Sequence, residues 1–435
     1  MRPGPRLRAT VALGAVAVLT AGCVSEDVRA TGGNSSSGTT IEVMYSLTGE
    51  QEAGFQSEVD AWAEENDVEV TFSQTSSFDE LVIARAQGND APDVALFPQP
   101  RIMREMADQN LLADLSDVVD QADLDPMIDG ALATGVVGGT QFAIPTSIDI
   151  KSLVFYPKRP FETAGYEVPE TYGDLVTLSQ EIADSGASPW CFGIDSEEAA
   201  GWPATDWVEH LMLIIHGGDV YDAWVTHEIP FNDERVIEAL EQMEQLLLAE
   251  GRTNGGRQSI AGNDYETVAR PMFDTPPGCL LHRQGGAVAE EGGFPEDVLA
   301  DLDNTVGVFP MPGPTAEDRP VLGGGELAGI FSKGNRYAEE LVRFLASSEY
   351  GTKGYAETGA WISARTDFDT DLYPTETLRS IARIGYESTE FVYDGSDQMP
   401  TEVGSDSFRR EMVAWIRNDQ DLHTTLDNIE NSWPD

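Results

Sequence analysis

Short apolar strands alternate with amphipathic helices from residue 41 onward, and this alternation narrows the possible folds more than any other feature. The runs "IEVMY" (41–45), "VEVTF" (68–72) and "DVALF" (93–97) have strand-like composition. The segments between them, including "FDELVIARAQ", place apolar residues at helical spacing. Strands that alternate with helices predict an α/β protein with a parallel sheet.

The pattern continues through the second half of the chain. The segments "YGDLVTLSQEIADSG", "DERVIEALEQMEQLLLAEG" and "RYAEELVRFLAS" predict further helices, and "LAGIF" predicts a strand. Thr171 is the expected N-cap of the first of these helices, and Gly186 is its expected stop. Pro98 and Pro100 break the chain just after the carboxyl end of a predicted strand, where ligands bind in open α/β sheets.

The first residues have the pattern of an export signal. Three arginines precede an apolar run at residues 9–22, which is shorter than the roughly 20 residues of a membrane-spanning helix. The run ends in "LTAGC", which resembles the bacterial lipobox, so we expect cleavage of residues 1–22 and a lipid on Cys23. The alternative is an ordinary signal peptide that is cut elsewhere and leaves Cys23 free. Residues 30–40, "ATGGNSSSGTT", have the composition of a flexible tether, so residues 23–40 form the predicted lipidated N-terminus and tether.

The chain is strongly acidic, with a formal net charge of −50. Phosphate backbones would be repelled, so we exclude nucleic acid as a partner. The acids are spread along the sequence and predict a highly charged, solvated surface. A saline habitat and a lineage with generally acidic secreted proteins both remain open explanations.

Two cysteines remain once Cys23 is assigned to lipid. An even pair in an exported protein is most simply a disulfide, so we expect Cys191 to pair with Cys279. Two buried free thiols are the alternative.

No common catalytic signature is present, and the histidines are not spaced as metal ligands, so we expect no metal and no cofactor. Trp190, Trp202, Asp206 and Trp207 instead fall within one short segment. Indole rings can lie against the C–H faces of a sugar, and carboxylates can accept hydrogen bonds from its hydroxyls. Taken singly, each of these side chains could also simply be part of the core.

Nine stretches, spread in order along nearly the whole mature chain, read "GNDAPDVALFPQP", "FAIPTSIDIKSLVFYPKRPFETAGYEVPETYGDL", "PWCFGID", "GWPATDWVEHLML", "VTHEIPFND", "PPGCLLHRQ", "LGGGEL", "YDGSDQMP" and "LDNIENSWP". They resemble one family: the maltose-binding-protein-like extracellular solute-binding lipoproteins of carbohydrate ABC importers, in particular their α-glucoside branch.

The resemblance implies an α/β, two-lobed periplasmic-binding-protein-like (type II) fold with three hinge crossings, near residues 148–151, 322–326 and 394–400. The first lobe would comprise residues 41–148 and 323–394. The second would comprise residues 149–322 and 395–435. Hinges of a few residues let such lobes close on a ligand.

The resemblance also implies a set of ligand contacts. The acid four residues after Pro145 carries over to Asp149, and the loop after the "PDVALF" strand implicates Pro98 and Gln99. The remaining positions in family-like cleft segments are Phe78, Trp202, Asp206, Glu326 and Trp361. The chain departs from its relatives at Arg409, where a Trp is frequent, and at Ser77, where an Arg is common, which puts one stacking position and the contribution of Phe78 in doubt.

The expected function is therefore that of a non-enzymatic receptor. A monomer tied by lipid to the outer face of a bacterial cytoplasmic membrane would capture an α-glucoside or a related di- or oligosaccharide and deliver it to ABC permease subunits. A secreted glycoside hydrolase with paired carboxylates is the alternative. A siderophore or metal receptor would need basic or His/Tyr clusters that we do not find in the sequence.

Overall fold

The computed structural model describes residues 40–289, 292–331 and 334–434. Contacts divide the chain into Met1–Gly38 and Thr39–Asp435, and the fold described below is that of the second unit. The predicted signal peptide, Cys23 and the tether up to residue 39 lie outside the described residues. No helix in the described part of the chain combines the length and apolar character that crossing a bilayer requires.

The first sheet has five strands in the order β2-β1-β3-β12-β6. The strands are β1 (Thr40–Tyr45), β2 (Glu69–Gln74), β3 (Val94–Phe97), β6 (Ala143–Pro145) and β12 (Leu327–Ile330). β1 pairs in parallel with β2 and β3, as the alternating pattern predicts. β12 comes from far along the chain and runs antiparallel between β3 and β6.

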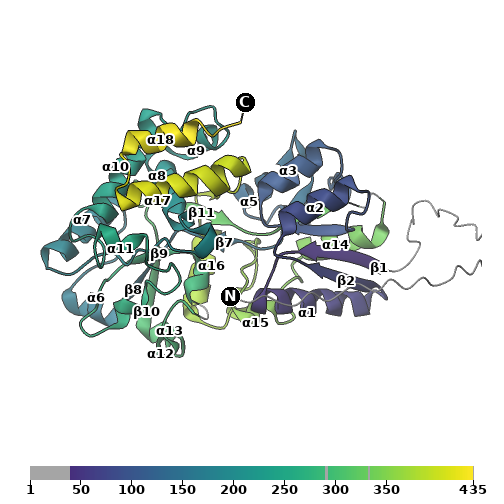
Figure 1. Ribbon diagram of the computed structural model, residues 1–435. Coiled ribbons are helices and arrows are strands. Elements are labelled where there is room, and N and C mark those ends of the chain that lie inside the picture. The colour runs from purple at the N-terminus through teal and green to yellow at the C-terminus, as the bar shows by residue number, and fades with distance from the viewer. Residues whose placement is uncertain (1–39, 290–291, 332–333, 435) are drawn as a thin grey trace, which may run out of the picture. The chain divides into compact units, whose positions relative to one another are not determined.

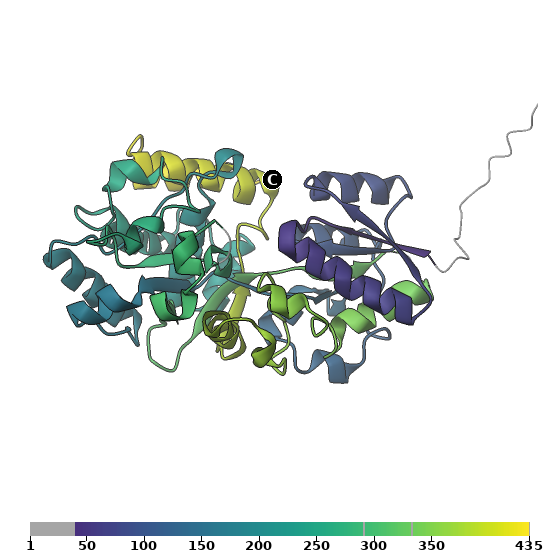
Figure 2. The ribbon, with the colours of Figure 1, turned by 90° about the horizontal axis from the view of Figure 1, so that it is seen from below.

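Helices cover both faces of the first sheet. α1 (Gly49–Glu65) lies on one side of β1 and β2, whereas α2 (Phe78–Gln87) and α3 (Pro100–Asp108) lie on the other (Figure 1). Figure 2, seen from below, has α1 in front of these strands. All four residues of β3 are buried, as expected for a strand covered on both faces. The other helices that accompany this sheet are α4 (Gln121–Leu124), α5 (Asp129–Thr134), α14 (Arg336–Ala346) and α15 (Tyr355–Thr358). β4 (Val136–Val137) and β5 (Thr140–Gln141) form a separate two-stranded ribbon. α16 (Glu376–Tyr386) packs instead against β10 (Val306–Pro310) of the second sheet.

The second sheet is antiparallel and has the order β10-β8-β9. Its strands are β8 (Leu153–Pro157), β9 (His282–Gln284) and β10 (Val306–Pro310). The helices of this part of the chain are α6 (Lys158–Ala164), α7 (Tyr172–Asp184), α8 (Trp202–His216), α9 (Gly218–Val225), α10 (Glu234–Met243), α11 (Arg257–Ile260), α12 (Glu296–Leu299), α13 (Leu302–Thr305), α17 (Phe408–Arg417) and α18 (Leu422–Glu430). α17 packs against α8, α11 and α18.

Local sequence explains where two of these helices begin and end. Thr171 caps α7 with a capping box, since its hydroxyl accepts from the Asp174 N–H and the Asp174 carboxylate accepts from the Thr171 N–H. Asp233 caps α10. The predicted single helix after Asp233 is wrong in its last turns, because α10 widens at Glu244–Leu248 into a π-helix that still buries Leu246, Leu247 and Leu248.

The third sheet joins three distant segments in the order β13-β11-β7. Its strands are β7 (Asp149–Ile150), β11 (Pro320–Gly324) and β13 (Glu390–Tyr393). Asp149 is paired with Gly324. The next residue, Gly325, has φ 137°, and a Cβ atom there would lie 2.1 Å from the carbonyl oxygen of Ser147, so the "LGGGEL" segment requires glycine at this point.

Buried apolar residues form two clusters. The first contains Phe55, Phe97 and Leu341, and the second contains Trp207 and Trp224. This arrangement of sheets and helices is the type II periplasmic-binding-protein fold that the sequence resemblance implies.

Candidate functional site

A cavity of about 350 Å³ is lined by residues of several elements and combines aromatic, acidic, basic and amide groups. Two of the predicted ligand contacts, Asp149 and Trp202, lie in its wall. The other lining residues are Gln51, Lys151, Tyr265, Glu266, Gln284, Gly285, Gly286, Ala287, Val288 and Gly293.

Asp149 is placed by β7. Its backbone is paired with Gly324 of β11, and its side chain is exposed to the cavity. The dense surroundings raise the pKa of this carboxyl group, and the nearby Lys151 ammonium acts in the opposite direction. The side chain can accept hydrogen bonds from hydroxyl groups that enter the cavity.

Trp202 begins α8 and presents a half-buried indole to the cavity. Its Nε1 donates to Ser196 Oγ at 3.2 Å, and the ring of Tyr265 meets it edge-on at 4.9 Å between centroids. Lys151 Nζ lies 5.6 Å from the centroid of the indole. Three contacts, with Ser196, Tyr265 and Lys151, therefore fix the orientation of the indole ring.

A smaller recess of about 30 Å³ has four lining residues in common with the main cavity, including Asp149 and Ala287. Trp361 lines this recess, where its ring stacks on Tyr355 and its Nε1 donates to the Thr146 carbonyl at 3.0 Å. Only 4% of Trp361 is exposed. The structure therefore places this predicted contact at the end of the cavity, largely within the core.

Asp206 does not line the cavity but lies beneath it in a buried ionic cluster. Its two carboxylate oxygens are 3.5 Å from Lys151 Nζ and 3.6 Å from Arg283 Nη1. Each cation also lies over an indole of α8: Lys151 over Trp202, and Arg283 over Trp207 at 5.5 Å. Burial raises the pKa of Asp206 to about 6, although the Lys151 charge lowers it. Its role as a ligand contact stays a prediction.

The rest of the cluster is acidic. Asp394 accepts a hydrogen bond from Lys151, and the ammonium holds the pKa of this carboxyl group below its usual range despite burial. Glu209 accepts from the backbone N–H groups of Gly395 and Ser396, at 2.8 and 3.3 Å. Oxygen atoms of Asp206, Glu209 and Asp394 come within 4.8 Å of one another, close enough for a metal ion. Lys151 and Arg283 compensate two of these three charges. Burial raises the pKa of Glu209 well above its usual range, which favours its neutral form, so the cluster does not need a metal.

Glu326 lies two residues after β11, near Asp149. Its backbone N–H donates to Ser147 Oγ, whereas its Oε2 atom is buried and has no hydrogen-bond partner among the described residues. Burial, together with the Asp149 charge, raises its pKa to about 8. The carboxyl group is therefore largely protonated at neutral pH and can donate one hydrogen bond.

The remaining predicted contacts lie away from the cavity wall. Phe78 is 2% exposed and packs edge-on against Phe97 at 5.7 Å. Pro98 and Gln99 are half-buried before α3, and Gln99 Nε2 lies 3.5 Å from Asp397 Oδ1. These three positions stay predicted ligand contacts.

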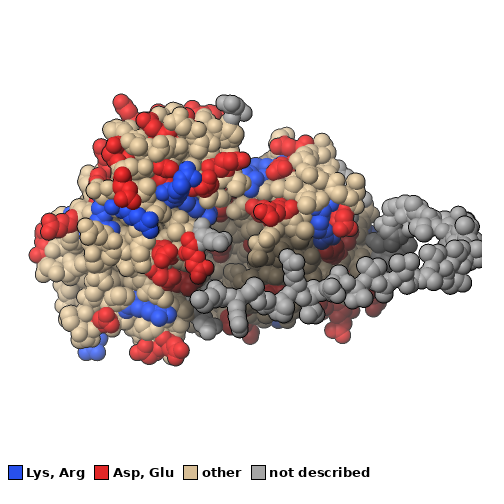
Figure 3. Space-filling view, viewed as in Figure 1, with Lys and Arg blue, Asp and Glu red and all other residues tan. Residues whose placement is uncertain are grey.

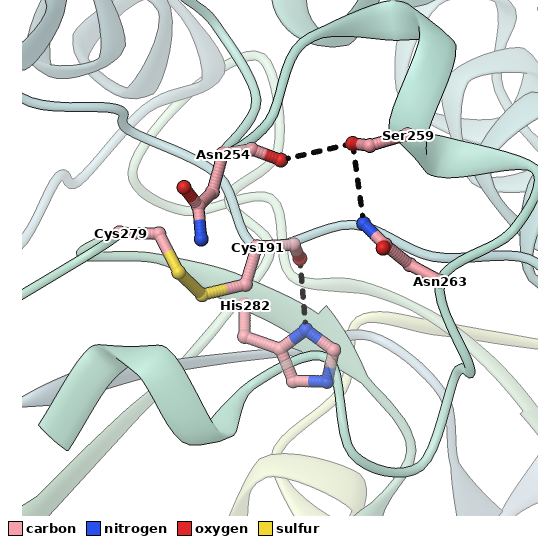
Figure 4. Close-up of a disulfide and its surroundings, with 6 residues drawn as sticks. All are labelled: Cys191, Asn254, Ser259, Asn263, Cys279 and His282. Carbon is pink, nitrogen blue, oxygen red and sulfur yellow. Dashed lines mark hydrogen bonds between the residues drawn. A yellow bond between two sulfur atoms is a disulfide. The ribbon is translucent and has the colours of Figure 1, made fainter. Parts of the chain in front are cut away.

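The predicted disulfide is confirmed and connects two segments that lead to the cavity. Cys191 and Cys279 are bridged, and His282 Nδ1 donates to the Cys191 carbonyl at 3.0 Å (Figure 4). Burial lowers the pKa of His282 to about 4, so the ring is neutral at physiological pH. One bridged segment leads from Cys191 to Trp202, and the other leads from Cys279 to Gln284. The disulfide therefore links covalently two segments that each supply a lining residue of the cavity.

Several lining residues were absent from the sequence prediction, most notably Lys151, Tyr265 and Gln284. "DIKSL" contains Lys151 only two residues after Asp149, and alternation along a short strand places such residues on one face. That signal could have identified Lys151. Tyr265 and Gln284 reach the cavity through tertiary contacts that no local pattern marks.

The chain matches the family model of bacterial extracellular solute-binding proteins over residues 46–352. It is 34% identical to the osmoprotective compounds-binding protein GgtB of Synechocystis over 91% of this chain and 92% of that one. It is also 34% identical to the alpha-glucosides-binding periplasmic protein AglE of Rhizobium meliloti over 88% and 85%.

The solved structure of the bacterial solute receptor AcbH, described as having an exclusive preference for β-D-galactopyranose, has the same fold. The TM-score is 0.77 at 19% sequence identity, over 90% of this chain and 98% of that one. The match to the family model and the two relatives show that this chain belongs to the bacterial extracellular solute-binding protein family, whose members bind solutes and are not enzymes.

Proposed function

We propose that this solute-binding protein captures an α-glucoside or a related di- or oligosaccharide in the cavity and delivers it intact to the permease of an ABC importer. The observation that carries the proposal is that the Trp202 indole and the Asp149 carboxylate line the same cavity. The name of AglE, an alpha-glucosides-binding protein, supports the ligand class.

The polar groups of the cavity suit a neutral, hydroxyl-rich ligand. The Trp202 face can lie against sugar C–H groups, while Asp149 accepts and Gln284 donates and accepts hydrogen bonds. Buried polar groups are costly unless they are hydrogen-bonded, so a sugar that lacked the matching hydroxyls would bind less well.

We propose that the two lobes are residues 41–148 with 323–394, and 149–322 with 395–435. The third sheet supports this division, because its strands β7, β11 and β13 lie at or next to all three predicted crossings. A short sheet of this kind can bend while the sheets on either side of the crossings stay intact.

We further propose that the mature protein is a monomer held at the outer face of the cytoplasmic membrane by a lipid on Cys23. The lipobox-like "LTAGC" supports this anchor. Palmitate labelling should be present in the native protein and lost in Cys23→Ala. Labelling that persists in the variant would contradict the anchor.

The ligand assignment can be tested with a thermal-shift panel of maltose, trehalose, sucrose and longer oligosaccharides, followed by calorimetry. A ligand that binds only the native state raises the unfolding midpoint by mass action. Chromatography of the recovered sugar should show it intact. No shift with any saccharide would contradict the proposal.

The site itself can be tested by substitution. Asp149→Ala and Trp202→Ala should each weaken binding of the identified sugar by roughly 2–4 kcal/mol if they are central contacts. Trp433→Ala is a matched control, because Trp433 stacks on His227 and does not line the cavity. Unchanged calorimetric affinity in both site variants would reject this location.

A further inference from the structure

Lys151 separates the cavity from the buried ionic cluster. It follows β7 directly, and its backbone N–H donates to the Leu322 carbonyl of β11 at 2.9 Å. Its side chain is 20% exposed and lines the cavity. One residue thus contacts the third sheet, the cavity and α8.

The ammonium group is fixed by two carboxylates. Asp394 accepts a hydrogen bond from it, and Asp206 Oδ1 lies at 3.5 Å. The side chains of these two acids are 3% and 1% exposed, so solvent screens the pairs only weakly. The other oxygen of Asp394 accepts from Ser396 Oγ at 2.7 Å and from the Asp397 N–H at 3.1 Å, which holds Asp394 in place.

The same ammonium group lies 5.6 Å from the centroid of Trp202, within the range of a cation–π interaction. Trp202 and Asp206 are four residues apart on α8, so they lie on the same face of this helix. Lys151 therefore contacts both side chains at once. Because its backbone is held by the third sheet, the position from which its ammonium group meets the indole is fixed.

We infer that Lys151 is a positioning residue for the binding site: it holds the Trp202 indole at the angle at which a sugar ring can stack. The inference rests on the proposed function, since it assumes that the ligand stacks on Trp202. Lys151 then affects affinity through the orientation of the Trp202 indole and not through a hydrogen bond or ion pair of its own with the ligand.

A double-mutant cycle tests this assignment. Lys151→Met, Trp202→Ala and the double variant are compared by calorimetry with the sugar identified in the panel. We expect Lys151→Met to weaken binding about tenfold. In the double variant, the further loss beyond Trp202→Ala should be under about twofold, because the side chain that Lys151 positions is already absent. Losses that multiply would overturn the inference, since Lys151 would then act independently of Trp202.

The variant Lys151→Met removes the cation next to buried Asp394 and leaves Asp206 with Arg283 alone, which destabilises a folded protein. Lys151→Arg keeps the charge and serves as the second variant. Its guanidinium is larger and planar, so it should displace the indole and weaken binding severalfold while the unfolding midpoint changes little. Wild-type affinity in Lys151→Arg would count against the inference. Arg336→Met is the control, because Arg336 also lies over an aromatic ring, 4.9 Å from the Tyr337 ring centroid. Arg336 is exposed and does not line the cavity.

Fluorescence separates failure of this inference from failure of the proposed function. The emission of Trp202 is obtained as the difference between the wild-type protein and Trp202→Phe, with no ligand present. Lys151→Met should shift this difference spectrum, because it removes a charge next to the indole, whereas Arg336→Met should leave it unchanged. If no saccharide binds the wild-type protein, the proposed function fails while the spectrum still tests the contact. An unchanged spectrum would overturn the contact in either case.

Discussion

Glu326 illustrates how a single side chain can make stability depend on pH. Its carboxyl group ordinarily titrates near 4.5, but burial raises the pKa in the folded protein to about 8. Between these two values the folded state holds a proton that the unfolded state has released. The free energy of unfolding contributed by this group therefore falls as pH rises through that window.

Substitution should remove this dependence. We expect Glu326→Gln to flatten the pH profile of the unfolding midpoint and to raise the midpoint above that of the wild-type protein by a few degrees at pH 9, while the two proteins differ less at pH 5. Thermal unfolding at these pH values measures the effect. Glu64→Gln, at an exposed position of α1, should leave the profile unchanged. A variant less stable than the wild type at pH 9 would contradict this account.

Single residues also show how far the binding site could be predicted from the sequence. Asp149 and Trp202 could be placed in a site because a resemblance carried them, and the structure puts both in the cavity wall. Asp206 could not be distinguished from them by sequence, since its contacts to Lys151 and Arg283 depend on how β7, α8 and β9 pack. An acid that pairs with buried cations looks the same in a sequence as an acid that faces a ligand.

At the level of the element, the disulfide joins the segment before α8 to the segment before β9. It spans a sequence separation of 88 residues, so it restricts the unfolded chain considerably. In the chain-entropy model, closure of a loop of this length contributes about 4–5 kcal/mol.

Removal of the bridge should therefore destabilise the protein. We expect Cys191→Ala with Cys279→Ala to lower the free energy of unfolding by about 2–5 kcal/mol and to weaken sugar binding severalfold, because the bonded segments lead to Trp202 and Gln284. Urea titration and calorimetry measure the two effects. Free-thiol titration of the denatured, unreduced wild-type protein provides the control and should find no thiol at these positions. Equal urea midpoints would contradict the expected role.

Elements with strong local signals were predictable. The segment "FDELVIARAQ" is α2, and the predicted Thr171 cap is confirmed, because both depend on neighbouring residues. The π-helix at Glu244–Leu248 was missed, since its apolar stripe is compatible with a regular α-helix. The position of β12 between β3 and β6 was not predicted either, as pairing between distant strands leaves no local trace.

For the whole molecule, the main physical constraint is charge. The net charge is −50, and Asp and Glu are spread over the face seen in Figure 3. Like charges repel across such a surface, and salt reduces this repulsion because the screening length falls from about 10 Å at 0.1 M to about 3 Å at 1 M.

Stability should accordingly rise with salt. We expect the unfolding midpoint to increase by several degrees between 0.1 and 1 M NaCl. Thermal unfolding at fixed pH measures this midpoint. A sorbitol series of equal osmolarity controls for effects that do not involve charge. A flat response to NaCl would remove the argument for adaptation to a saline habitat and leave the acidity as a property of the lineage.

The predicted fold class and the predicted solute-binding function are confirmed by the family match and by the relatives that align over most of their length. The alternative of a glycoside hydrolase is not supported, because the family consists of binding proteins. The exact lobe boundaries, the lipid anchor and the remaining ligand contacts stay predictions.

The central position of β12 has a consequence for the order in which the fold can form. The first sheet pairs β3 with β6 only through Leu327–Ile330, so its hydrogen-bond ladder stays interrupted until three quarters of the polypeptide has been made. A chain whose synthesis has not yet reached Leu327 thus lacks the strand that joins β3 to β6. The first sheet can be completed only late, and pairing between strands so far apart in sequence is intrinsically slow.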